Sequence, residues 1–244
     1  AASLNTLVNK GCQSSINKYL DSIKNGASSS IYLQVTGTPQ AIFLQTMASG
    51  WHPYFTHYFE PGSAYLGGDF FFPKNRTADC ISYLEKITKP ERQVVLHHLA
   101  VSGQILATGG KTCNCLLHPS VRQAVHSKYA KAMAAELTWC LEHLNDEFKD
   151  ALEKEYATLN PQKASKVDFD TLFAAVKNLL ETNAVKVIVM NGKNDVDSAE
   201  YSSGSNIIIG GNTLGRGVTF PGLHTIYYTR TSKKPQADTM WQHS

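Results

Sequence analysis

The chain has 244 residues, of which 42% are hydrophobic and 18% charged, and its net charge is +3. This is the composition of a globular protein with one large domain or two small ones. No apolar run approaches the roughly 20 residues that span a bilayer, and residues 1–17 lack the pattern of a signal peptide. We therefore expect a cytoplasmic protein with no membrane partner, whose mild positive charge permits a nucleic-acid partner without demonstrating one.

Helical periodicity and β-rich runs alternate along the chain. The sequence predicts helices over residues 13–22, 77–87, 91–106 and 168–181, and one long helix or two abutting helices over 125–156. It predicts strands over residues 31–35, 113–118, 185–190, 207–209 and 223–229. This alternation predicts an α/β fold in which helices cover both faces of a parallel sheet.

Residues 51–76 are rich in aromatic residues, proline and glycine and show no clean period. We interpret them as an ordered but irregular segment, because so many large apolar side chains disfavour a solvated chain. The aromatic residues would either pack between lobes or stack on nucleobases.

The most informative stretch is the turn formed by residues 210–220, which joins two predicted strands. It holds four glycines that allow the backbone to approach a ligand closely: Gly210, Gly211, Gly215 and Gly217. Arg216 lies between two of them, and its planar guanidinium suits an oxyanion such as phosphate. Ligands collect at strand ends of α/β sheets, so the turn predicts phosphate binding. The alternative is a tight turn whose arginine faces water.

Two other motifs in the chain are weaker, and each has a simpler structural interpretation. The sequence from Gly109 to Thr112 looks like the end of a P-loop, but a helical pattern precedes it and a strand follows, so Lys111 is expected in a helix-to-strand connector. His97 and His98 are adjacent on a predicted helix, where their side chains point in different directions and do not share a metal easily.

The cysteines are five in number, an odd count that predicts reduced thiols: Cys12, Cys80, Cys113, Cys115 and Cys140. Three of them could be assembled with His118 and His143 into a zinc site, but the usual paired spacing is missing. Buried thiols without a metal are the better interpretation.

Three segments resemble motifs of superfamily-two helicases. Residues 36–41, Thr-Gly-Thr-Pro-Gln-Ala, are similar to the third motif, with Gly37 in place of the usual alanine. Residues 210–220 resemble the fifth motif, and residues 238–244 resemble the beginning of the sixth.

The details most closely resemble the Z-one (Z1) domain family, bacterial and phage proteins proposed to be endonucleases and built around a helicase-like ATPase. The likeness spans nearly the whole chain, and its specific boxes are Ala2–Thr6, Tyr65–Gly68 and Leu116–Ser120. It implies a RecA-like fold of the P-loop NTPase and helicase type, with a parallel sheet flanked by helices. Residues 1–46 would then be the end of the first RecA-like lobe, 47–112 an irregular aromatic-rich and helical connector, and 113–244 the second lobe.

The resemblance also implies roles for individual residues. ATP would lie between the two lobes, and DNA would cross both on one face. The positions implied to contact DNA are Thr36, Thr38, Ser120, Arg216 and Thr219. Gln242 would line the ATP cleft as a catalytic residue together with Arg216. The positions implied near the nucleotide are Gly211, Thr213, Gly215 and Gly217.

One departure from the helicase pattern limits the functional prediction. These 244 residues contain no Walker A loop, no Asp-Glu pair for magnesium and no arginine finger. The finger alone is typically worth about 10³ to 10⁵ in rate, so we expect negligible ATP hydrolysis by this chain alone. ATP and Mg²⁺ would be bound by the full-length protein, with the remainder of the helicase as partner.

Three functions follow from these patterns. The first is a portion of an ATP-dependent, helicase-like DNA-processing enzyme of a restriction or defence type. The second is a non-catalytic module that binds nucleic acid or supports assembly. The third is a metal-dependent nuclease that uses Asp195, Asp197 and Glu200, although these residues also fit a solvated loop.

Overall fold

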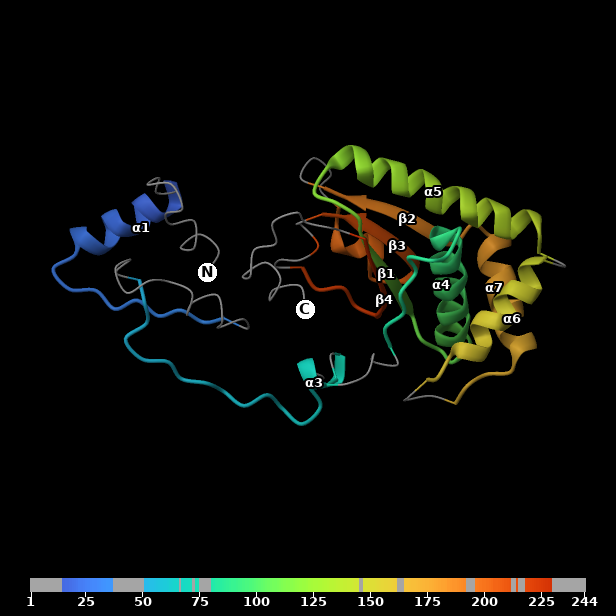
Figure 1. Ribbon diagram of the computed structural model, residues 1–244, viewed down its shortest axis with the longest axis horizontal. Helices are drawn as coiled ribbons and strands as arrows, with labels where there is room; N and C mark the ends of the chain where they lie inside the picture. The colour runs from blue at the N-terminus through green and yellow to red at the C-terminus, as the bar shows by residue number, and fades with distance from the viewer. Residues whose placement is uncertain are drawn as a thin grey trace. The chain divides into compact units, whose positions relative to one another are not determined.

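Four parallel strands form the centre of the larger of two compact units, Tyr83–Thr231 (Figure 1). The computed structural model describes residues 15–36, 51–65, 67–71, 73–74, 80–144, 147–161, 165–191, 196–211, 214 and 218–229. The strands are β1 (Thr112–His118), β2 (Val185–Met190), β3 (Gly204–Gly210) and β4 (Leu223–Tyr228), in the order β2-β3-β1-β4. All pairings are parallel, so the predicted α/β class, the parallel sheet and these four strands are confirmed.

Four helices lie on one side of this sheet, two of them packed directly on its strands and two packed mainly on other helices. They are α4 (Pro90–Ala107), α5 (Gln123–Glu142), α6 (Glu147–Thr158) and α7 (Phe169–Glu181). Their apolar residues form one core cluster with strand residues such as Leu117, Ile207 and Ile209. The long periodic stretch is therefore two abutting helices, and Phe148 of α6 is fully buried where they meet the core.

The other face of the sheet is covered by connections instead of helices. Leu116 and Ile208 pack there against Tyr201 and Leu214, in a cluster to which none of the four helices contributes. Tyr201 ends the short 3₁₀ helix η2 (Ser198–Tyr201), and Leu214 belongs to the β3–β4 connection. The expectation of helices on both faces is thus correct for one face only in the described residues. Both connections are about as short as a parallel crossover allows, and the only helix among their described residues is the short η2.

Two buried asparagines fasten these connections to the sheet. Asn114 of β1 donates through Nδ2 to the carbonyl oxygens of Tyr201, at 2.9 Å, and Pro221, at 2.6 Å. Asn206 of β3 donates to Asn114 Oδ1 at 2.8 Å. A buried polar group is costly unless it is hydrogen-bonded, so this pair stabilises only the arrangement in which both connections lie against the sheet.

A second buried polar network lies between α4 and the sheet. Ser205 Oγ shares hydrogen bonds of 2.9 Å with His98 Nε2 and with Ser102 Oγ. Burial lowers the pKa of His98 to about 3, helped by repulsion from His97 and His224, so this imidazole is neutral. His97 faces the opposite way, with Nδ1 at 3.2 Å from Glu155 Oε2. The two histidines diverge as predicted.

The smaller unit comprises Ala1–Ser82 and Ser232–Ser244. It contains α1 (Ser15–Gly26), which confirms the first predicted helix, and the short α3 (Gly68–Phe71). Residues 51–65 have no regular structure, as predicted, and Trp51 is buried and donates to Asp21 Oδ1 at 2.8 Å. The expectation that the other aromatic residues of this segment avoid solvent is wrong, because Tyr54 and Phe55 are exposed.

Two predictions for the N-terminal third of the chain are wrong. Residues 31–35 form no strand, and the side chains of Ile31, Leu33 and Val35 are exposed. A β-rich run becomes a strand only when a neighbour completes its hydrogen-bond ladder, and no described residue does so here. The helix expected over residues 77–87 is absent from residue 80 onward, and its first residues lie outside the described part of the chain.

Candidate nucleic-acid interface

Two chain segments meet where β1 and β3 end. The strands are neighbours, with Leu117 paired to Ile209, so the residues that follow them emerge at the same edge of the sheet. Ser120 follows β1 and Gly211 follows β3. The structure thus brings together two of the predicted site residues, at the edge where ligands of parallel sheets collect.

The contact between these segments depends on the absence of a side chain at Gly211. A methyl group added there would lie 2.9 Å from the carbonyl oxygen of Ser120 and 3.3 Å from the ring of His126. The backbone of the glycine-rich turn therefore approaches the β1–α5 loop as closely as it can.

His126 holds the β1–α5 loop in place. Its Nε2 lies 2.6 Å from the carbonyl oxygen of Ser120, and a carbonyl only accepts, so the proton is on Nε2. The side chain is only 2% exposed, and Nδ1 finds no hydrogen-bond partner in the described part of the chain. We call Ser120, Arg122, His126 and Gly211 the carboxyl-edge site.

The amino terminus of α5 lies at this site. Arg122 is the N-cap residue, but its side chain does not cap the helix, and no acidic residue occupies the first turn. The Arg122 N–H donates to Ser120 Oγ at 3.2 Å, which leaves the hydroxyl proton of Ser120 available for a ligand. A 20-residue helix carries a partial positive charge at this end, and the exposed Arg122 guanidinium adds a full one. The arrangement suits an anion with several oxygens.

The remaining predicted residues are divided between the two units and the undescribed parts of the chain. Thr219 is exposed between Val218 and Phe220, which pack in the second core cluster. Thr36 lies in a segment of the smaller unit that has no regular secondary structure. Those that lie outside the described residues are Thr38, Thr213, Gly215, Arg216, Gly217 and Gln242.

Sequence reasoning missed Arg122 and His126. Neither belongs to a recognised box, and a single histidine on a helix is usually a core residue. The available signal was their position in the sequence, because both residues follow shortly after the strand predicted over residues 113–118.

The alternative metal sites receive no support from the described residues, in which no three histidine, cysteine or carboxylate side chains gather. Asp197 instead caps η2, since its Oδ1 accepts from the Ala199 N–H at 3.0 Å. Asp195 lies outside the described residues. Burial raises the pKa of Cys113 to about 11 and that of Cys115 to about 12, so these thiols are protonated, as expected of buried cysteines.

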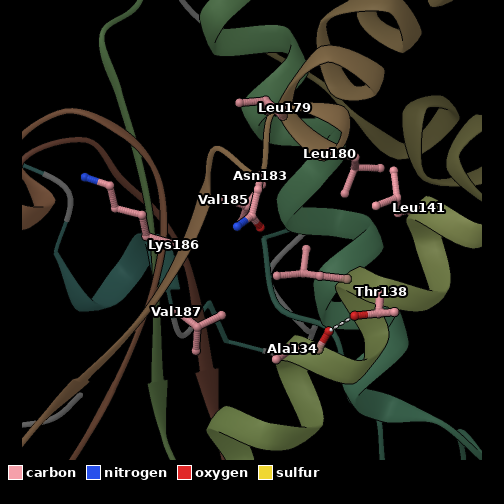
Figure 2. A pocket seen from close by; sticks show the side chains of 10 residues that line it. Ala134, Thr138, Leu141, Leu179, Leu180, Asn183, Val185, Lys186 and Val187 are labelled. Atoms are coloured by element: carbon pink, nitrogen blue, oxygen red, sulfur yellow. Dashed lines mark hydrogen bonds between the residues drawn. The ribbon is translucent and has the colours of Figure 1, made fainter.

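Two further features lie away from the carboxyl-edge site. Lys111 is in the connector between α4 and β1, as predicted, at the opposite edge of the sheet. A hollow of about 470 Å³ between α5, the end of α7 and the first half of β2 is lined mainly by apolar groups. Figure 2 shows its only charged residue, Lys186, pointing away from the helices. The hollow therefore does not suit a phosphate.

In the part of the chain that the structure describes, no helix combines the length and apolarity needed to cross a membrane. Neither the curated proteins nor the solved structures include one that matches the chain. The Z1 domain family model, by contrast, matches residues 93–244, more than half of the chain and all of the carboxyl-edge site. The chain therefore belongs to the Z1 domain family.

Proposed function

We propose that this chain is the nucleic-acid-binding portion of an ATP-dependent, helicase-like DNA-processing enzyme of the restriction or defence type. The observation that carries the proposal is the convergence of Ser120, the amino terminus of α5 and the Gly211 backbone at one edge of the sheet. In this proposal the full-length protein binds ATP and Mg²⁺, and this unit holds the DNA backbone.

The chemistry of the site supports phosphate as the ligand. Backbone amides at a helix terminus, a hydroxyl and a guanidinium are groups that commonly contact phosphate oxygens in protein–DNA complexes. They carry no base preference, so binding here is expected to be independent of sequence. Arg216 and Thr219 would extend the contact along the glycine-rich turn, and Gln242 would face the nucleotide.

The proposal predicts how DNA binding depends on salt. Arg122→Ala and Arg216→Ala should each remove about one phosphate contact, which makes the plot of log K against log salt shallower by about 0.7 to 0.9. Binding of single- and double-stranded oligonucleotides would be measured by fluorescence anisotropy over a range of salt concentrations. Lys111→Ala is the matched control, because it removes an exposed cation at the opposite edge of the sheet.

Equal losses in all three variants would mean that binding follows net charge, and would contradict a site at the carboxyl edge. DNA-stimulated ATP hydrolysis by the full-length protein separates a motor from a non-catalytic binding module. DNA binding that retains its salt dependence, without such hydrolysis, would favour the module.

A further inference from the structure

The edge strand β4 carries two exposed side chains on the face that the connections cover elsewhere. Ile226 and Tyr228 are in register with Leu116 and His118 of β1. The β1 residues are buried, whereas Ile226 is 61% and Tyr228 49% exposed. The cover over this face therefore leaves β4 open at Ile226 and Tyr228.

The ring of Tyr228 packs against one neighbouring ring, although half of its surface is open. Its centroid is 5.2 Å from that of His118, with 33° between the two ring planes. The backbone at this point is fixed as well, because the Thr229 N–H donates to the carbonyl oxygen of His118 at 3.3 Å. A braced ring on a strand loses little conformational entropy when a ligand stacks on it.

Tyr228 lies close to the carboxyl-edge site. It pairs with His118, and Ser120 is two residues further along the same chain segment. Since adjacent strands are about 4.8 Å apart, the ring is within roughly one nucleotide of the Ser120 hydroxyl. An open aromatic ring close to a site that contains the exposed Arg122 suits a nucleic acid better than an apolar protein surface.

We propose that Tyr228 is a stacking platform for a nucleobase of the strand whose phosphates occupy the carboxyl-edge site. The inference rests on the proposed function and adds a contact of a different kind, to the base instead of the backbone. Every base has a flat π-face, so the platform tolerates any sequence. It distinguishes a single strand, whose bases are open, from a duplex, whose bases are already stacked.

The test compares oligonucleotides that differ only in their bases. Tyr228→Leu should weaken binding of a single-stranded oligonucleotide about tenfold, and Tyr228→Phe should bind like the wild type because the ring is kept. An abasic oligonucleotide of equal length should bind the wild type and Tyr228→Leu equally, and the salt dependence should be unchanged. Tyr83→Leu, which alters another exposed tyrosine of the same unit, is the control.

The outcomes separate this inference from the proposed function. If the wild type binds no oligonucleotide, the proposed function fails. If the wild type binds with the expected salt dependence but Tyr228→Leu does not change the affinity, only the stacking platform is excluded. The same holds if Tyr228→Leu weakens binding of the abasic and the normal oligonucleotide by the same factor. Two further results would also exclude the platform. One is that Tyr228→Leu weakens binding of a free nucleoside triphosphate but not of an oligonucleotide. The other is that the wild type sediments as a dimer and Tyr228→Leu sediments as a monomer. Should Tyr228→Leu fail to fold, Tyr228→Trp decides the matter, since a larger ring should bind as tightly or more tightly.

Discussion

Replacement of Gly222 by alanine is expected to lower the free energy of unfolding by about 2 to 5 kcal/mol. Gly222 precedes β4 and has a φ of +59°, a conformation that is strained for any residue with a Cβ. An added methyl group would also lie 2.4 Å from the carbonyl oxygen of Thr112. That oxygen belongs to the backbone of the central strand β1, and the neighbouring Asn114 N–H donates to Gly222 O at 2.7 Å, so relief requires β4 to move.

Gly109→Ala is the matched control for this substitution. Gly109 also has a positive φ, +83°, but an added methyl group would meet nothing within 4 Å. Its cost should be the backbone strain alone, about 1 to 2 kcal/mol. Urea unfolding of both variants, followed by circular dichroism, measures the difference. Similar losses in the two variants would show that steric contact with β1 contributes nothing.

The second large effect is a loss of stability in acid that depends on His98. The unfolded chain binds a proton at this position below a pH of about 6.5, whereas burial holds the pKa of the folded imidazole at about 3. Between these values the unfolded state binds more protons, so stability falls as the pH is lowered, and is retained above pH 6.5. The folding equilibrium should change about tenfold for each pH unit within this window.

The contribution of His98 can be isolated by substitution. His98→Gln removes the titrating group and keeps a polar side chain near Ser205, so its stability should decline less steeply between pH 6.5 and 4. His143→Gln serves as the control, because His143 is partly exposed at the end of α5, lies outside the buried network and is not among the causes of the lowered His98 pKa. Carboxylates titrate in all three proteins, and their effect cancels in the comparison. Parallel profiles for wild type and His98→Gln, measured by urea unfolding at each pH, would contradict this account.

Sequence patterns predicted the elements of the larger unit because strands such as β2 and β3 are short β-branched runs and helices such as α7 have a clear apolar period. The same patterns failed at residues 31–35, where the run of apolar residues is genuine but the described chain offers no strand to pair with it. They also did not reveal which face of the sheet the helices cover, because crossovers are nearly always right-handed and the face therefore depends on the strand order.

The candidate site was predictable only in part. Ser120 and Gly211 were indicated by motif boxes, but their contact depends on β1 and β3 being neighbours, which no local pattern specifies. His126 acts through a hydrogen bond to a backbone carbonyl, and such a bond leaves no trace in residue spacing. Arg122 favours anion binding because it lies at the amino terminus of α5, and the sequence does not show at which residue that helix begins.

The one-sided placement of the helices gives the sheet two faces of unequal stability. The helical face is closed by a continuous apolar core, whereas the other depends on a small cluster and on the Asn114–Asn206 pair. Local opening in proteins begins where apolar burial is least. We therefore expect the connections to detach from the sheet at a free energy below that of global unfolding. Such an opening would expose Leu116 and Ile208 while the four helices remain folded, which gives this domain a partly open state that differs from the unfolded chain.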